Sequence, residues 1–512
     1  MKRIYVISAL VVLAASSCKK SFIELAPLDS LSPTTFFSTE AQLRQAVTAA
    51  YTPLRDLEND DYFLCEMRSD NTHYQTYASN RGTAYVQREN ISDFVDDPTN
   101  SYTNSEYFNC YTGISRANIV IGRIGQVTLT AAAKNDIDGQ AKFLRAFNYF
   151  KLVRLFGGVP LYLKEVDNAE DAFLLRSTAD QVYTQIVSDA TDAVNELAPP
   201  AKFPQSGQAT KGSATMLLAE VYMIQKKYPE AEALLTTLAG MGYGLNTNYS
   251  DAFLTTNKNS KESLFEVQYL EGTAAGTQPS NFIYQFLPRT STTTLITGTT
   301  TNTAAIGGWN TPTQDLINSY EVGDKRLDAS IGVAEGIYNA SDLLAITANK
   351  SIVGYTPAAG KIGVPYAKKY LHLPHVATNN TNDDWPIYRY ADALLMLAEA
   401  QNEQGKSPLV SLNLVRTRAG LLPSTETNQA NLRTILAHER RVELAFENHR
   451  WNDLVRTGTA VSVMTAYGIT AKATYNLLPS NAFTITSDKL LFPIPQSERD
   501  VNPGLSQNPG YF

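Results

Sequence analysis

The segment at residues 136–156 carries apolar side chains on nearly every face of a helix, and this feature constrains the fold most. A helix that is apolar all round has to be covered on all sides, so we predict that it lies in the middle of a large helical domain. Gly157-Gly158 followed by Val159-Pro160 predicts its end, because glycine adopts the left-handed cap and proline cannot continue a helix. The apolar positions are Ile137, Phe143, Leu144, Phe147, Phe150, Val153 and Phe156.

Two other places in the chain predict pairs of helices joined by a tight turn. The first pair runs from Gly212 to Lys226 and from Tyr228 to Gly240. The second runs from Tyr390 to Gln404 and from Ser407 to Ala419, with Pro408 in the first turn of its second helix. Pairs of this length are the unit of tetratricopeptide-like repeats, although the consensus of that repeat is incomplete here.

The rest of the chain divides into helical and irregular stretches. A capping box at Thr39-Glu40-Ala41-Gln42 predicts the first helix, and apolar periodicity predicts others at 178–197 and 431–447. Residues 56–104 and 243–386 show little helical period, and long irregular segments inside a compact protein are usually functional or mobile. We therefore predict a mainly α fold, a tetratricopeptide-like helical scaffold with a large loop-rich insertion.

The N-terminus has the pattern of a bacterial lipoprotein signal. Lys2 and Arg3 precede a short apolar run from Ile4 to Ala15, which is too short to span a bilayer. Ala15-Ser16-Ser17-Cys18 then resembles a lipobox, which predicts cleavage before Cys18 and acylation of that cysteine. The alternative is an ordinary secretory signal with a chance cysteine. Stable anchoring by several acyl chains needs no transmembrane helix.

Charge and cysteine content limit the remaining roles. The formal net charge of −7 disfavours nucleic-acid binding, which needs clustered Lys and Arg, and also disfavours direct adsorption to anionic lipid. After cleavage at Cys18 only Cys65 and Cys110 remain. An oxidising compartment would permit a disulfide between them, but two separate buried thiols are an equal alternative.

Searches for catalytic, cofactor and metal motifs each fail at an essential position. His438-Glu439 begins like a zincin helix, but Val442 stands where the second histidine is required. His372 and His375 flank Pro374, which breaks the helical face that a metal pair would need. Adjacent acidic pairs such as Asp383-Asp384 are poor acid–base pairs, because neighbours in an extended strand point apart. We predict no enzyme activity, no cofactor and no metal.

Several segments in order resemble the SusD/RagB family of nutrient-binding lipoproteins. The lipobox is followed by Phe22-Ile23-Glu24, close to the F-L-E of the family, and Lys211-Gly212-Ser213-Ala214 heads the next repeat as in the family. The resemblance covers nearly the whole chain. The other matching runs are AKFLRAFNYF at 141–150, LFGGVPL at 155–161, PIYRYADALLMLAEA at 386–400, LNLVRTRAG at 412–420, ERRVELAFENHRW at 439–451, FPIP at 492–495 and QNPGY at 507–511. We interpret the charged residues of the 439–451 run as a helix face paired to a neighbouring loop.

This resemblance implies a function and a division of the chain. It implies a cell-surface protein, lipid-anchored in the outer membrane, that captures oligosaccharides or polysaccharides for a SusC-like TonB-dependent transporter. Capture of peptides, as in RagB-like members, is the close alternative; a protein-interaction scaffold and a surface glycoside hydrolase are distant ones. The expected parts are a signal peptide (1–17), a tether (18–38), the N-terminal scaffold half (39–242), the insertion (243–386) and the C-terminal half with its turn-rich tail (387–512).

The resemblance also directs attention to two regions for ligand contacts. Known glycan sites of the family are shallow aromatic platforms built from the irregular region after the first helix and from the large insertion. Sugar rings stack on aromatic faces, while acidic, amide and guanidinium groups bind hydroxyls. Ordinary loop packing is the alternative for each residue. The expected ligand-binding residues are Arg68, Asp70, Asn71, Tyr74, Tyr77, Arg81, Tyr85, Tyr284, Trp309 and Trp385.

Overall fold

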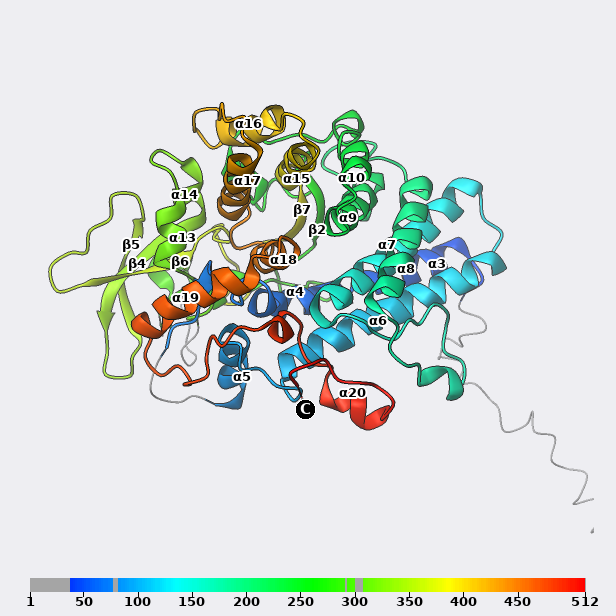
Figure 1. Ribbon diagram of the computed structural model, residues 1–512, viewed down its shortest axis with the longest axis horizontal. Coiled ribbons are helices and arrows are strands. Elements are labelled where there is room, and N and C mark those ends of the chain that lie inside the picture. Colours follow the sequence, from blue (N-terminus) through cyan, green and yellow to red (C-terminus); the bar gives the residue numbers. More distant parts are fainter. Residues whose placement is uncertain (1–36, 77–81, 291, 300–306, 512) are drawn as a thin grey trace, which may run out of the picture.

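The computed structural model describes residues 37–511, except 77–81, 291 and 300–306. Helices dominate it, and its β-structure is limited to small sheets (Figure 1). The predicted mainly α fold class is confirmed. No helix in the described part of the chain is both long enough and apolar enough to cross a bilayer.

The long apolar helix predicted at 136–156 is α7, Ala131–Phe156, and it lies in the middle of the helical half. It packs against α6 (Ser101–Arg123) and α8 (Ala179–Glu196), with α3 (Glu40–Tyr51) beside them (Figure 1). Its phenylalanines are almost completely buried. The helix ends at Phe156 as predicted, and Gly157 has a positive φ of 73°, although its ψ of −135° lies outside the left-handed helical region.

Three helices in this half begin with the same device. Thr39, Thr178 and Thr210 each form a capping box, in which the threonine hydroxyl and the side chain three residues later satisfy each other's backbone N–H groups. The start predicted for the first helix is therefore confirmed. The threonines fix the starts of α3, α8 and α9 (Lys211–Ile224).

The expectation of an irregular segment at 56–104 was wrong for much of its length. Helix α4 runs from Pro53 to Leu64 and α5 from Thr83 to Ser92. The apolar periodicity did not predict α4, because this helix buries carboxylates as well as apolar side chains. Lys151 Nζ on α7 lies 3.0 Å from Asp61 and 3.3 Å from Glu58, so these acids point inward where apolar residues are expected.

This buried cluster predicts an unusual pH dependence. Burial raises the pKa of Glu58 to about 7, above its ordinary value of 4.5, although Lys151 opposes the shift. A carboxyl whose folded pKa is raised favours folding below its unfolded pKa, and this contribution is lost as the pH rises through 7. Glu58→Gln is therefore expected to stabilise the protein at pH 8 by roughly 1–3 kcal/mol and to have little effect at pH 4.5.

Melting temperatures of wild type and Glu58→Gln at pH 4.5 and pH 8 test this expectation. Glu230→Gln is the matched control, because Glu230 is exposed on helix α10 (Tyr228–Leu235). An equal difference between wild type and Glu58→Gln at both pH values would show that Glu58 does not carry the pH dependence.

The predicted helix pairs are present. In the first pair, α9 (Lys211–Ile224) is followed by α10 (Tyr228–Leu235), which ends five residues before the predicted Gly240. In the second, α15 (Tyr390–Glu403) is followed by α16 (Leu409–Arg418). Helix α15 packs against α10, so the two pairs form one continuous layer in the upper part of the view (Figure 1). The helix predicted at 431–447 is α17, Gln429–Glu443.

The region 243–386 contains more regular structure than its pattern predicts. Strands β4 (Ile331–Tyr338), β5 (Leu344–Ser351) and β6 (Ile362–Ala367) form an antiparallel sheet with β4 in the centre. The first six residues of β4 are all buried, so the alternation that marks a half-exposed strand is missing. Other elements of the region are short: β3 (Thr311–Pro312), which pairs with β1 (Thr72–His73) from outside the region, α11 (Phe282–Phe286), α12 (Thr294–Thr297), α13 (Gln314–Ser319) and α14 (Lys325–Ser330).

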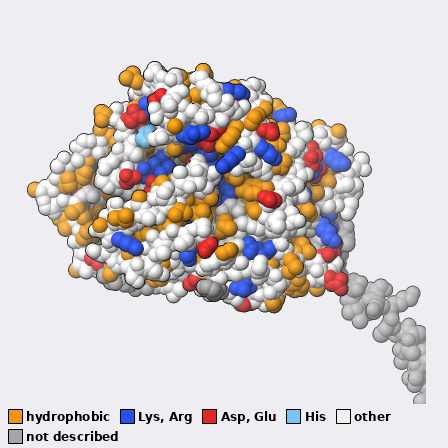
Figure 2. Space-filling view, in the orientation of Figure 1, with side chains coloured by type: hydrophobic (Ala, Val, Ile, Leu, Met, Phe, Trp, Pro, Cys, Tyr) orange, Lys and Arg blue, Asp and Glu red, His pale blue; other side chains and the backbone are white. Residues whose placement is uncertain are grey.

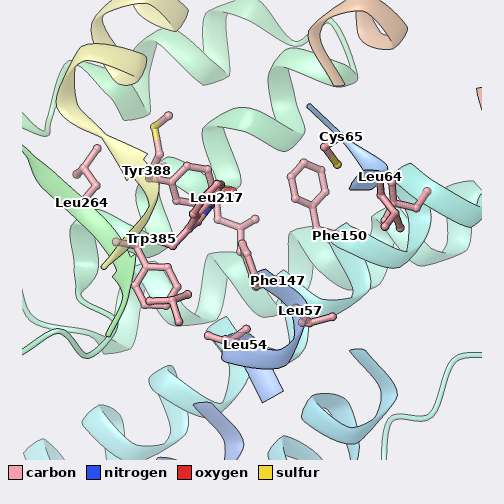
Figure 3. Close-up of a cluster of buried hydrophobic side chains, with 14 of the residues drawn as sticks. Leu54, Leu57, Leu64, Cys65, Phe147, Phe150, Leu217, Leu264, Trp385 and Tyr388 are labelled. Carbon is pink, nitrogen blue, oxygen red and sulfur yellow. The ribbon is translucent and has the colours of Figure 1, made fainter. Parts of the chain in front are cut away.

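The central core lies where the helical half meets a two-stranded sheet. Strand β2 (Ser263–Val267) pairs antiparallel with β7 (Trp385–Arg389), so the two ends of the insertion lie side by side. Figure 3 shows Trp385 and Tyr388 of β7 packed with Phe147 of α7 and with side chains of α4 and α9. This cluster ties segments more than 300 residues apart into one core.

The C-terminal part also contains helices where the sequence showed mainly turns. They are α18 (Arg450–Arg456), α19 (Ala460–Thr474) and α20 (Gln496–Val501). Cys65 and Cys110 are both buried and both free, so the alternative of two separate thiols is the one that the structure contains. Short 3₁₀ turns lie at Ile124–Gln126, Glu170–Ala172, Ala239–Met241, Tyr249–Ala252 and Ser487–Leu490.

Candidate functional site

An open cleft of about 400 Å³ lies between the segment after β1, the β4–β5 hairpin and the segment after α19. Figure 1 shows these elements together at the left of the molecule, where α19 runs toward the β4–β6 sheet. Most of the residues that line it carry polar side chains. The residues that line it are Gln75, Thr76, Arg289, Tyr338, Asp342, Asn476 and Leu477.

Hydrogen bonds between distant segments build the floor of the cleft. The N–H of Gln75 donates to the carbonyl of Gly308 at 2.7 Å, and its side-chain oxygen accepts from the N–H of Arg289 at 2.8 Å. Gly308 has a φ of 90°, and Cβ atoms of Gln75 and Arg289 lie within 3.6 Å of the place where its own Cβ would be. A side chain at position 308 would thus be strained by this φ, although its Cβ would make only ordinary contacts with Gln75 and Arg289.

The outer wall of the cleft comes from the hairpin. Tyr338 ends β4 with 44% of its surface exposed, and Asp342 lies in the turn that leads to β5. Burial and the nearby Asp342 carboxylate raise the pKa of Tyr338, which keeps its phenol protonated as a hydrogen-bond donor. The cleft therefore offers an aromatic face, amide groups, one guanidinium and one carboxylate. This set suits a neutral ligand rich in hydroxyl groups.

Four of the expected ligand-binding residues are buried in the core. Their side chains pack between helices and strands, so they do not form an exposed platform. Arg68 lies between the rings of Phe94 and Phe492 and pairs with Asp96 at 2.9 Å. The other three, Tyr284, Trp309 and Trp385, have at most 3% of their surface exposed.

Asp70 and Asn71 are also buried, and their polar groups bind other parts of the chain. Asp70 accepts two hydrogen bonds from Arg450, at 2.7 and 2.8 Å. Asn71 donates to Glu66 at 2.9 Å and accepts from Arg441 at 2.8 Å. These residues join the segment after α4 to α17 and α18, which gives them a structural role within the described chain.

One expected residue does lie beside the cleft. The half-buried ring of Tyr85 stacks on Trp309 at 5.3 Å and lies 6.0 Å from the guanidinium of Arg289, which lines the cleft. Tyr74 is buried beneath this stack, 6.4 Å from Trp309, and its hydroxyl donates to Asp93. Trp309 thus supports Tyr85 from below. Two further expected residues, Tyr77 and Arg81, lie outside the described residues.

The sequence reasoning missed most of the cleft. Gln75 and Thr76 fall inside the irregular stretch 56–104, and Arg289 falls inside the stretch 243–386. No pattern marked Tyr338, Asp342 or Asn476, because each is a polar or aromatic residue in a turn or at a strand end. They come together only in the folded chain, where the hairpin and the segment after α19 line the same cleft.

A second hollow, of about 510 Å³, is lined by several arginines whose charges are balanced by nearby carboxylates. Figure 2 shows Lys and Arg side chains gathered in a depression in the upper half of this face, where α15, α17 and α18 meet. Its arginines are engaged: Arg433 with Glu403, Arg440 with Asp392, and Arg456 with Glu399. Such pairs leave little free charge for an anionic ligand.

The charged run at 439–451 forms part of the structural core. Glu443 lies 3.0 Å from Arg389 and 3.2 Å from Arg326, and Glu439 lies 2.6 Å from Arg326. These glutamates are completely buried, so the face is not exposed to solvent. The prediction of pairing to a loop holds for Arg450, whose partner Asp70 lies after α4.

Comparison with known proteins gives matches along most of the chain. Residues 261–511 match the model of the SusD family, and residues 21–223 match a model described as starch-binding and associating with the outer membrane. SusD-like protein P2 of Formosa agariphila is 27% identical over the whole of both chains. The starch-binding protein SusD of Bacteroides thetaiotaomicron is 24% identical, over 73% of this chain and 72% of that protein.

A solved structure agrees with these matches. A laminarin binding SusD-like protein is 27% identical and superposes with a TM-score of 0.72, covering 93% of this chain and 100% of its own. The sequence matches and the structural similarity thus point to one family. The chain belongs to the SusD/RagB family.

Proposed function

We propose that this protein captures glycans at the cell surface, without cleaving them, and passes them to a SusC-like TonB-dependent outer-membrane transporter. The observation that carries the proposal is the open polar cleft with its exposed Tyr338 ring. Two relatives support the ligand class, since one is described as laminarin binding and another as starch-binding. A glycoside hydrolase uses two facing carboxyl groups, whereas the described lining of the cleft contains only Asp342.

Tyr338→Ala is expected to weaken glycan binding by about two- to tenfold, because ring stacking contributes about 0.5–1.5 kcal/mol beyond area burial. The melting temperature should stay nearly constant, since the ring is partly exposed at a strand end. Isothermal titration of the purified protein with laminarin and with soluble starch measures the affinity.

Tyr228→Ala is a matched control, because Tyr228 is a partly exposed tyrosine on α10, outside the cleft. Equal loss of binding in both variants would remove the cleft from the proposal. Binding of oligopeptides in place of both glycans would favour the RagB-like alternative. Release of reducing ends by the purified protein would overturn the non-catalytic role.

The proposal also includes a lipid anchor at Cys18, which lies outside the described residues. Its support is the charged start, the short apolar run and the small residues before the cysteine. Cys18→Ala is expected to move the protein from the membrane fraction to the soluble fraction of the cell envelope. Immunoblots of separated fractions measure this, and continued membrane retention of the variant would count against the anchor.

A further inference from the structure

A third hollow, an apolar and open groove, shares no lining residue with the cleft. It has a volume of about 330 Å³ and lies between α6, the segment at 160–173 and α20. Two aromatic side chains stand at its surface, Phe108 with 61% and Phe173 with 49% of their area exposed. Exposed aromatic groups gathered around one hollow are typical of an interaction site.

Aromatic and other apolar side chains form most of the wall of this groove. The hydroxyl of Tyr111 donates to the carbonyl of Pro160 at 2.8 Å, and that of Tyr162 donates to the carbonyl of Ala172 at 2.7 Å. Both hydroxyls are thus engaged with the backbone. The groove is therefore a poor site for a ligand recognised through many hydroxyl groups, and a better one for apolar side chains.

One carboxylate in the groove lacks a partner. Glu498 of α20 is half-buried, and its side chain forms no hydrogen bond or ion pair with the described residues. Besides burial, its charge raises the pKa of Tyr107 and of Tyr162, so it lies close to both phenols. A carboxylate surrounded by aromatic rings attracts a cation, because the rings and the charge both favour it.

The rim of the groove is acidic as well. The segment 164–171 contains Lys164 and four acids. Lys164 pairs with Asp171 at 3.0 Å, and Glu165 pairs with Arg123 at 2.7 Å. Asp167 and Glu170 are exposed and form no ion pair with any described residue. The surface therefore fits a segment that carries both positive and apolar side chains.

The chain itself has such a segment before its first described residue. Lys19-Lys20-Ser21-Phe22-Ile23-Glu24-Leu25 combines two adjacent cations with three apolar residues. The described chain begins at Phe37, whose ring lies 4.8 Å from the guanidinium of Arg123. Arg123 is at the end of α6, and its partner Glu165 follows Lys164 of the groove directly. The chain thus enters the described structure beside the groove.

The length of the chain permits the segment to reach the groove. Phe22 precedes Phe37 by 15 residues, which span up to about 50 Å when extended. Phe108 and Arg123 are also 15 residues apart, but on a helix this is only about 22 Å. We propose that residues 19–25 bind in this groove of the same molecule, with Lys19 or Lys20 at Glu498 and Phe22 against the exposed rings.

This docking would give the groove a role in orienting the protein. Cys18 directly precedes the docked segment, so if it carries the anchor of the proposed function, α6 and α20 would lie next to the lipid. The docking itself needs no lipid and no glycan. It can therefore be tested separately from the proposed function.

The test uses the chain from residue 18 onward with Cys18→Ser, and a photoreactive benzoylphenylalanine in place of Phe22. All described core clusters lie after residue 36, so these changes leave the core intact. After irradiation, mass spectrometry of peptides is expected to find cross-links to 107–118, 160–173 or 496–505. Lys19→Glu with Lys20→Glu, and separately Glu498→Gln, are each expected to lower the yield roughly fivefold.

Glu230→Gln, an exposed acid on α10, is the matched control and should leave the yield unchanged. Mixing isotope-labelled and unlabelled protein separates contacts within a molecule from contacts between copies. Cross-links scattered over other surfaces, cross-links only between copies, or a yield insensitive to Lys19, Lys20 and Glu498 would each overturn the proposal. Circular dichroism confirms that every variant remains folded.

Discussion

Arg389→Met is expected to destabilise the protein by about 3–5 kcal/mol, because it leaves buried carboxylates without their main partner. The Arg389 guanidinium lies 2.9 Å from Glu262, 3.0 Å from Glu443 and 2.7 Å from Glu447. All four side chains are almost completely buried. Arg418 is a second cation in the cluster, at 2.9 Å from Glu262. We expect that it does not replace Arg389 in the variant.

Urea unfolding followed by circular dichroism measures the loss. Arg433→Met is the matched control, since Arg433 forms an exposed pair with Glu403 at 2.6 Å. Exposed pairs contribute about 0–1 kcal/mol, so the control should change stability little. Similar losses in the two variants would contradict the assignment of Arg389 to the structural core.

The same network predicts how the loss of stability in Arg389→Met depends on pH. Burial alone would raise the pKa of Glu443, but Arg418, Arg389 and Arg326 outweigh it and lower the pKa to about 2, from an ordinary 4.5. A lowered folded pKa contributes stability that is complete above pH 4.5 and disappears as the pH falls toward 2. The difference between wild type and Arg389→Met should therefore narrow over this range.

The helical scaffold could be predicted from the sequence because its signals are local. The all-round apolar pattern of α7 and the threonine caps act over a few residues, and both are present as expected. Helix α4 was missed because Glu58 and Asp61 point inward to Lys151, a partner about 90 residues away. Strand β4 was missed because it is buried on both faces and shows no alternation.

The candidate site was harder to predict for a related reason. Aromatic and charged residues in an irregular stretch can serve a ligand or the core, and sequence alone does not separate these roles. Arg68 has an aromatic sandwich and a buried partner supplied by segments distant in the chain. The cleft, in turn, is built by the meeting of a hairpin turn with the end of α19, and no local pattern encodes that meeting.

Trp309 is the residue for which the sequence left the sharpest choice, between an exposed ligand platform and a packed core. Its ring is 3% exposed and meets Phe63 edge-on at 5.4 Å and Tyr85 face-on at 5.3 Å. The guanidinium of Arg88 lies 5.1 Å from it. These contacts favour packing as the main role. They also make the indole the support beneath Tyr85, the expected residue that lies beside the cleft.

Trp309→Ala is therefore expected to lower stability by about 3–5 kcal/mol, the usual loss for a buried tryptophan. Thermal unfolding measures this, and Trp309→Phe is the control, because a smaller ring retains most of the packing and should lose clearly less. Trp309 is expected to affect glycan affinity only by holding the Tyr85 ring in place. The loss of affinity in Trp309→Phe should therefore not exceed the loss in Tyr85→Ala. A Trp309→Ala protein with an unchanged melting temperature and strongly reduced affinity would instead assign the indole to direct ligand contact.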